Sequence, residues 1–229
     1  MPQALAIGGF CPFSSLDYPG ELSCVVFCQG CTWACSYCHN PHLRAHGAGS
    51  LSWTGLQAFL NERHGLLDAV VFSGGEPLLQ ASLANAMQTI RDQRFKVGLH
   101  TSGIAPQRLA EVLKYCDWVG LDMKTHKHKY ATLTGDRRSA ELAIASLDVL
   151  LSGRVPFEVR TTWHPNIMTE DELLDLVNSL ARRGVQHFRL QLFRAGNCLD
   201  AEANAWPMSP ISADLQNRIG QFFPDFQVR

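Results

Sequence analysis

A short cysteine-rich loop, Cys28 to Pro41 (CQGCTWACSYCHNP), is the feature that most constrains this chain. Three of its cysteines, Cys31, Cys35 and Cys38, are spaced C-x-x-x-C-x-x-C. Thiolates are soft ligands that suit iron–sulfur clusters and zinc. Three thiolates in so short a loop can hold three irons of a four-iron cluster and leave the fourth iron open. The alternative is a zinc-binding interaction module, with His39 as the fourth ligand of a structural zinc.

The composition excludes several broad classes of function. The chain has 229 residues and a formal net charge of -1, which predict one domain over residues 1–229 and no general attraction to nucleic acid or to a membrane. No apolar run is long enough to span a bilayer, and the N-terminal residues lack the plan of a signal peptide, so we expect a soluble, cytoplasmic protein. Cysteines outside the motif are then reduced packing residues, with Cys28 the uncertain one.

Apolar, strand-like runs alternate with segments of helical period along the chain. The expected strands cover residues 22–28, 69–72, 95–100, 118–123, 157–161 and 187–193. The expected helices cover residues 53–63, 78–93, 106–115, 139–151 and 170–183, with a weaker helix after Ser212. Short connections between them predict parallel strand–helix units with the helices outside. Six such units are too few for a closed eight-unit barrel, so we predict an α/β fold with an open, partial (β/α)6 barrel.

Polar motifs follow the predicted strands where functional residues of parallel α/β folds gather. They are the cysteine loop, SGGEP (73–77), HTSG (100–103) and DMK (122–124). Paired glycines let a backbone approach a ligand closely, and strand alternation puts Asp122 and Lys124 on one face. An inward Arg160 in the fifth strand would need an anion. We therefore expect these segments to form one site.

Two segments around the loop resemble a known family. SSLDYPG (14–20) and YCHNP (37–41) are similar to the glycyl-radical-enzyme activases of the radical S-adenosylmethionine (SAM) superfamily. Among these, the chain most resembles the activating protein of anaerobic ribonucleoside-triphosphate reductase, through VVFCQGC, LLDAVVFSGGEP, GLHTSG and WVGLDMK. The resemblance extends from about Pro12 to Phe193 and agrees with the partial barrel.

The resemblance implies a cofactor, a reaction and partners. Cys31, Cys35 and Cys38 would ligate a [4Fe-4S] cluster that cleaves SAM reductively, and the 5′-deoxyadenosyl radical would generate a glycyl radical on a partner enzyme. The implied partner is anaerobic ribonucleoside-triphosphate reductase, with an electron donor such as flavodoxin. The choice of reductase rests on resemblance alone. A radical SAM enzyme acting on a small molecule, such as 7-carboxy-7-deazaguanine synthase, is the alternative within enzymes.

The resemblance also implies roles for individual residues. The expected cofactor-binding residues are Tyr37, His39, Gly74, Gly75, Glu76, His100, Thr101, Asp122, Lys124, Arg160 and Gln191. The GGE element would bind the SAM amino group, and Lys124 and Arg160 its carboxylate. Asp122 would contact the ribose or a cation, and Gln191 the ribose or adenine. His100 stands where activases often carry aspartate. The resemblance therefore leaves open whether a monovalent cation binds beside it.

Asp17 has two interpretations. In the activases, the aspartate at this place helps to hold the substrate glycine loop. Aspartate also favours turns, so Asp17 could simply cap the turn formed by Asp17-Tyr18-Pro19-Gly20.

Overall fold

A computed structural model of the chain, which describes residues 4–229, contains one sheet of eight strands in the order β1 to β8. The strands are β1 (Ile7–Ser14), β2 (Ser23–Cys28), β3 (Ala69–Gly74), β4 (Lys96–Thr101), β5 (Trp118–Asp122), β6 (Phe157–Trp163), β7 (His187–Leu192) and β8 (Asp225–Val228). β1 is antiparallel to β2, and all other neighbouring pairs are parallel. Within the described residues β1 and β8 do not pair, so the barrel is partial and open, as predicted.

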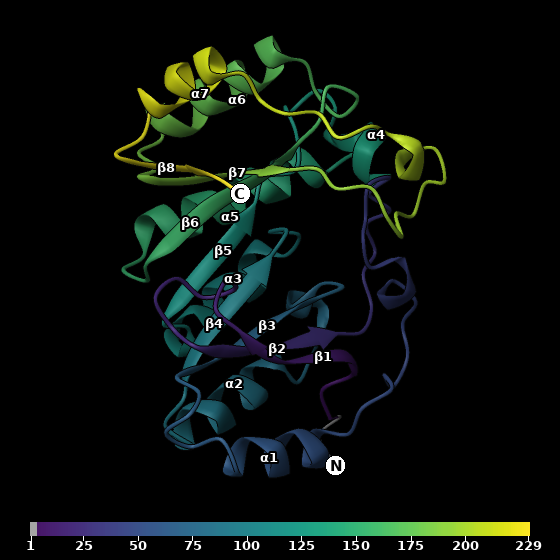
Figure 1. The fold of residues 1–229 in the computed structure, drawn as a ribbon. Coiled ribbons are helices and arrows are strands. Elements are labelled where there is room, and N and C mark those ends of the chain that lie inside the picture. Colours follow the sequence, from purple (N-terminus) through teal and green to yellow (C-terminus); the bar gives the residue numbers. More distant parts are fainter. Residues whose placement is uncertain (1–3) are drawn as a thin grey trace.

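The helices lie on the outside of this curved sheet (Figure 1). They are α1 (Trp53–Asn61), α2 (Leu83–Asp92), α3 (Pro106–Val112), α4 (Tyr130–Thr134), α5 (Ser139–Ser152), α6 (Glu170–Arg182) and α7 (Ala213–Gly220). Figure 1 shows α1 and α2 beside the first strands and α6 and α7 beside the last. Side-chain caps fix several starts; Ser52 caps α1, and Thr169 forms a capping box with Glu172 at α6. Among residues 4–229 no helix is long and apolar enough to cross a membrane.

The six expected strands are β2 to β7, with small shifts at their ends, but β1 and β8 were not predicted. β1 contains Gly8, Gly9 and Pro12, which weaken the signal of a strand, and it lies at the edge of the sheet. β8 has only four residues at the other edge. The helix expected over residues 78–93 is divided: Pro77–Leu79 form a 3₁₀ turn, and α2 begins at Leu83.

The two faces of the sheet differ. The face toward the helices carries the main core, and Cys28 belongs to it, fully buried. The inner face has a small apolar cluster of Tyr18, Val25, Ala69, Val71 and Trp118. On β6 and β7, buried Glu158, Arg160 and Arg189 take the place of apolar residues. The inside of the barrel is therefore apolar beside β2 to β5 and charged beside β6 and β7.

Candidate active site

A cavity of about 230 Å³ lies at the carboxyl ends of the parallel strands, and all three motif cysteines line it. The other expected site residues in its wall are Tyr37, His39, Gly74, Gly75, His100, Thr101, Asp122, Lys124 and Gln191. Glu76, Arg160 and Asp17 do not line it. The structure thus brings most of the expected residues to one cavity and leaves three of them outside.

The thiols of the cysteine loop border one shared cavity. Within residues 4–229, no three His, Cys, Asp or Glu side chains are arranged to hold one metal ion. The ligand sulfurs of a four-iron cluster bind separate irons, so they need to border one shared space. Burial, and then the charge of Glu76, raise the pKa of Cys31 to about 12, and burial also raises the pKa of Cys35. The positive charge of bound iron would offset this cost of forming thiolates.

The His39 ring contacts the segment that follows β7. Its Nε2 lies 2.6 Å from the backbone oxygen of Arg194, and its ring stacks on Phe193. The next residues continue this contact, since the backbone N–H of Leu199 donates to the carbonyl of Cys38 at 3.0 Å. Segment 193–200, which sequence analysis did not connect with the site, therefore holds one side of the cysteine loop in place.

Close packing requires glycine at positions 74 and 75, apart from any contact that these residues make with a ligand. Gly74 has a positive φ of 104°, and a Cβ on it would lie 2.5 Å from the backbone nitrogen of Cys28. A Cβ on Gly75 would lie 2.5 Å from the carbonyl oxygen of Gly30. Both glycines line the cavity as well. The end of β3 can pack against the start of the cysteine loop only because these two residues lack side chains.

Glu76 lies beneath the cavity and is almost fully buried. Its carboxylate accepts hydrogen bonds from the backbone N–H of Leu78, from the Thr101 hydroxyl at 2.7 Å, and from both the N–H and the hydroxyl of Ser102. Burial raises its pKa, against these hydrogen bonds. Glu76 therefore ties the turn after β3 to the end of β4, and its expected contact with SAM stays a prediction.

Asp122 and Lys124 lie on the same side of the strand end, as alternation predicted. The Lys124 ammonium group donates to the Asp122 carboxylate at 2.7 Å. Burial opposes the charge of both groups, yet their mutual attraction prevails, so the pKa of Asp122 is lowered and that of Lys124 is raised. The Tyr37 hydroxyl donates to the Lys124 carbonyl at 3.2 Å. The cavity therefore contains a charged lysine with N–H donors beyond the one that Asp122 uses.

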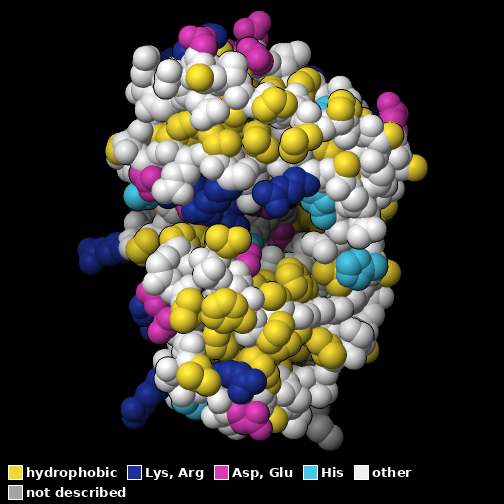
Figure 2. All heavy atoms as spheres, viewed as in Figure 1, with side chains coloured by type: hydrophobic (Ala, Val, Ile, Leu, Met, Phe, Trp, Pro, Cys, Tyr) yellow, Lys and Arg dark blue, Asp and Glu magenta, His cyan; other side chains and the backbone are white. Residues whose placement is uncertain are grey.

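His100 connects this cavity with a second one. Its Nε2 lies 2.8 Å from the Asp17 carbonyl oxygen. Burial, reinforced by the charge of Arg160, lowers its pKa to about 3, so its ring is neutral at pH 7. Asp17 and Arg160 line the second cavity, of about 400 Å³, which shares His39, Thr162 and Gln191 with the first. Figure 2 shows a hollow on this face with Lys and Arg side chains beside it.

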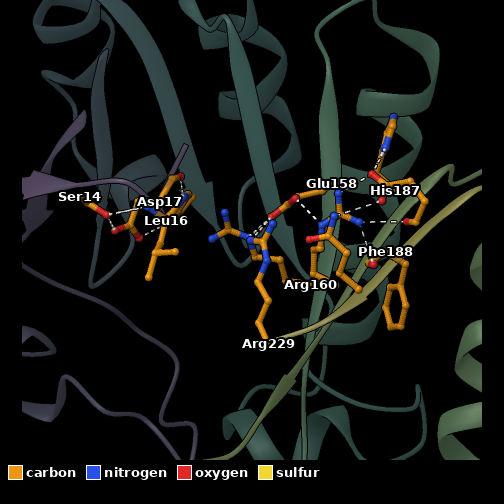
Figure 3. A network of polar contacts seen from close by, with 12 residues as sticks. Ser14, Leu16, Asp17, Glu158, Arg160, His187, Phe188 and Arg229 are labelled. Atoms are coloured by element: carbon orange, nitrogen blue, oxygen red, sulfur yellow. Dashed lines mark hydrogen bonds and ion pairs between the residues drawn. The ribbon is translucent and has the colours of Figure 1, made fainter. Parts of the chain in front are cut away.

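Both interpretations of Asp17 find support in the local geometry. The Ser14 hydroxyl donates to the Asp17 carboxylate, and the Glu21 N–H donates to the Tyr18 carbonyl at 3.2 Å, which closes the turn at Pro19 and Gly20. The Asp17 side chain is nevertheless 38% exposed and faces the second cavity, so it can reach a substrate there. Figure 3 shows Asp17 across from Arg160.

Some residues of the first cavity were not expected. They are Trp33, Asn40, Ser73, Ser102 and Thr162. All five had a signal in the sequence. Trp33, Asn40, Ser73 and Ser102 lie within motifs that sequence analysis singled out, and Thr162 shares the face of β6 that carries Arg160.

Comparison with known proteins identifies the class of protein that this fold and cavity define. The family model described as the radical SAM superfamily matches residues 25–162, more than half of the chain, and the chain belongs to this superfamily. Radical SAM enzymes use a [4Fe-4S] cluster and SAM, and the three cysteines around one cavity fit that cluster.

Two individual relatives are named as activating enzymes. The chain is 28% identical to a Methanocaldococcus jannaschii protein named as a glycyl-radical enzyme activating enzyme, covering 88% of this chain and 85% of that one. It is 35% identical to the pyruvate formate-lyase-activating enzyme of Clostridium pasteurianum, over about half of each protein, 52% and 53%.

Solved structures confirm the fold alone. Streptococcus suis SuiB bound to S-adenosylmethionine matches with a TM-score of 0.63 at 15% identity, covering 88% of this chain and 48% of that one. QueE from Escherichia coli matches with a TM-score of 0.60 at 14% identity, covering 99% and 94%.

Proposed function

We propose that this chain is an activase that generates a glycyl radical on a partner enzyme, and that the partner is anaerobic ribonucleoside-triphosphate reductase. The observation that carries the proposal is the cavity that Cys31, Cys35 and Cys38 share with the Gly74-Gly75 turn and Lys124. Similarity to a protein named as a glycyl-radical enzyme activating enzyme, over 88% of the chain, supports the class. The choice of the reductase rests on the resemblance of VVFCQGC, LLDAVVFSGGEP, GLHTSG and WVGLDMK.

The chain's own residues bind and orient SAM. Cys31, Cys35 and Cys38 would hold a [4Fe-4S] cluster, which would supply the electron for reductive cleavage of SAM and so the radical that abstracts hydrogen from the target carbon. Lys124 is our candidate for binding the SAM carboxylate, because it lines the cavity and its ammonium group has free N–H donors. The backbone of Gly74 and Gly75 lines the same cavity and is our candidate for binding the SAM amino group. Asp122 and Gln191 remain candidates for the ribose and the adenine.

Other expected residues act from the edges of this site. Tyr37 and His39 border both cluster and SAM in this proposal, and Thr101 and Glu76 fix the glycine turn. Arg160 lines only the second cavity, so we place it beside the substrate instead of the SAM carboxylate. An electron donor such as flavodoxin is proposed from the resemblance alone.

The test is electron paramagnetic resonance of the partner. The protein is reconstituted anaerobically with iron and sulfide, reduced, and incubated with SAM and the reductase. The expected result is about four irons per chain, 5′-deoxyadenosine as a product, and a glycyl doublet on the reductase. Zinc in place of iron would support the interaction module. Cleavage of SAM with a modified small molecule and no doublet would support the small-molecule enzyme.

Asp17→Asn separates the two roles of that residue. Asn keeps the size of the side chain and its turn preference but loses the negative charge. As a substrate contact, Asp17→Asn lowers the yield of the glycyl doublet far more than it lowers SAM cleavage without partner. If the doublet yield stays normal, Asp17 serves the turn only.

A further inference from the structure

A short segment after β5, residues 130–136, contacts two different walls of the first cavity. It consists of α4 and the turn that follows, where Gly135 ends the helix with a φ of 75°. One side of this α4 segment contacts Lys124, and the other side contacts the cysteine loop. In Figure 1, α4 lies beside the chain that leaves β2. The α4 segment is therefore placed to set the position of one wall relative to the other.

Two tyrosines hold the backbone of Lys124. The ladder between β5 and β6 ends at Asp122, so Lys124 lies beyond it. Its N–H donates to the Tyr130 hydroxyl at 2.8 Å, and its carbonyl accepts a hydrogen bond from the Tyr37 hydroxyl at 3.2 Å. Tyr130 belongs to α4 and Tyr37 to the cysteine loop. Both polar groups of the Lys124 backbone are thus fixed by side chains, and this determines where the lysine side chain begins.

The Tyr130 hydroxyl has few alternatives to this contact. Tyr130 is almost fully buried, and the other contact of its hydroxyl is the Met123 sulfur at 3.8 Å, which is a weak acceptor. Leaving a donor without its acceptor is unfavourable in a protein interior. Loss of this hydroxyl would therefore cause the Lys124 N–H to seek another partner, and the lysine backbone would move.

The far end of the α4 segment holds the cysteine loop between its first two motif cysteines. The backbone N–H of Ala34 donates to the Thr134 carbonyl at 2.7 Å. The indole N–H of Trp33 donates to the Asp136 carboxylate at 3.2 Å. The Trp33 side chain is buried and lines the first cavity. Asp136 therefore fixes the orientation of a ring that borders the same space as the three thiols.

We propose that Tyr130 and Asp136 are positioning residues of the SAM site. Tyr130 acts through Lys124, and Asp136 acts through Trp33 and the cysteine loop. One SAM molecule has to reach both the cluster and Lys124, so its affinity depends on how well their relative position is maintained. Because both positioning residues belong to the α4 segment, they maintain that position together. The proposal rests on the proposed function and specifies which residues outside the cavity determine SAM affinity.

A double-mutant cycle tests Tyr130, with the dissociation constant of SAM measured by calorimetry on the reconstituted protein. Tyr130→Phe removes only the hydroxyl, and we expect it to weaken SAM binding about fivefold, within the effect of one hydrogen bond. In the Lys124→Ala background the same change is expected to cause no further loss, because it acts through the lysine side chain. Tyr115→Phe is the matched control, since Tyr115 is partly buried and precedes β5 at the opposite end of the barrel.

A second cycle tests Asp136 through Trp33. Asp136→Ala removes the acceptor, whereas Trp33→Phe removes the indole N–H and keeps an aromatic ring. We expect Asp136→Ala to weaken SAM binding about threefold in the wild type and to cause no further loss in the Trp33→Phe background. Both single variants are also expected to change the electron paramagnetic resonance spectrum of the reduced cluster with SAM. Asp148→Ala is the matched control, because Asp148 is an exposed carboxylate on α5 that pairs with Arg183.

Each outcome decides for or against the positioning roles. A SAM affinity in Tyr130→Phe or Asp136→Ala equal to that of its control overturns the role of that residue. Losses that multiply in the double variants also overturn it, because the residue then acts apart from its partner. Lower iron content in Tyr130→Phe than in the wild type shows that the hydroxyl supports the fold, which again overturns its positioning role.

These measurements need no partner enzyme. A missing glycyl doublet on the reductase, with both cycles as expected, counts against the proposed function alone. A normal doublet with multiplying losses counts against the positioning roles alone. A wild-type protein that takes up four irons and does not bind SAM overturns both.

Discussion

At the scale of single residues, two buried thiols of this chain differ in what surrounds them. Cys35 borders the first cavity, whereas Cys116 packs in the main core and contacts the Val112 carbonyl. Cys35→Ala is expected to lose the absorbance of the reconstituted cluster and all SAM cleavage. Cys116→Ser is expected to keep both and to lower the free energy of unfolding by about 1 kcal/mol. Full iron content and cleavage in Cys35→Ala would contradict the ligand assignment.

Lys124 is the residue on which SAM affinity should depend most directly. Its ammonium group is only partly exposed, so its bond to a carboxylate is poorly screened by water. Lys124→Ala is expected to weaken SAM binding by about 1.5–3 kcal/mol, measured by calorimetry on the reconstituted protein. Lys127→Ala changes an exposed lysine three positions further on and serves as the control. An unchanged dissociation constant in Lys124→Ala removes it from the site.

At the scale of elements, the sequence predicted those strands whose burial leaves a continuous apolar run. β2 to β5 are buried on both faces for most of their length, which is why their runs were clear. β1 and β8 lie at the edges and lack that signal. The carboxyl ends of parallel strands meet at one edge, and this rule is sufficient to place the motifs at one site from the sequence.

The division of the site into two cavities could not be predicted. It depends on the direction of the Arg160 side chain, which turns toward Glu158 on its own strand and lies over Gly120 of β5. A sequence pattern gives the face of a strand on which a residue lies but not the direction in which a long side chain extends along that face. The same limit applies to Glu76, whose four hydrogen bonds come from elements far apart in sequence or from its own turn.

The contact between the end of β3 and the cysteine loop predicts a specific weakness. Gly75→Ala would place a Cβ 2.5 Å from the Gly30 carbonyl oxygen, where only backbone could move away. We expect a loss of about 1–3 kcal/mol in urea denaturation and lower iron incorporation. Gly47→Ala is the matched control, because nothing lies within 4 Å of a Cβ there. Equal stability of the two variants would contradict the close packing.

At the scale of the whole molecule, the single sheet of eight strands supports our proposal that residues 1–229 form one domain. A buried titratable group in such a sheet makes the stability of the fold depend on pH. His100 is such a group. It faces Asp17 before β2, Asp122 on β5 and Arg160 on β6, and its pKa is lowered to about 3.

The consequence is a loss of stability in mild acid. The unfolded chain protonates His100 near its ordinary pKa of 6.5, while the folded chain keeps it neutral down to about 3. The unfolded state therefore binds more protons in this window, and stability falls as the pH falls from 6.5 toward 3. Between pH 6.5 and pH 5 this amounts to about 2 kcal/mol.

His100→Gln keeps a side chain that can donate to the Asp17 carbonyl but cannot titrate. Urea denaturation of both proteins at the two pH values measures the difference, and the wild type is expected to lose about 2 kcal/mol more than the variant. Parallel losses in the two proteins would show that His100 is not kept neutral by the fold.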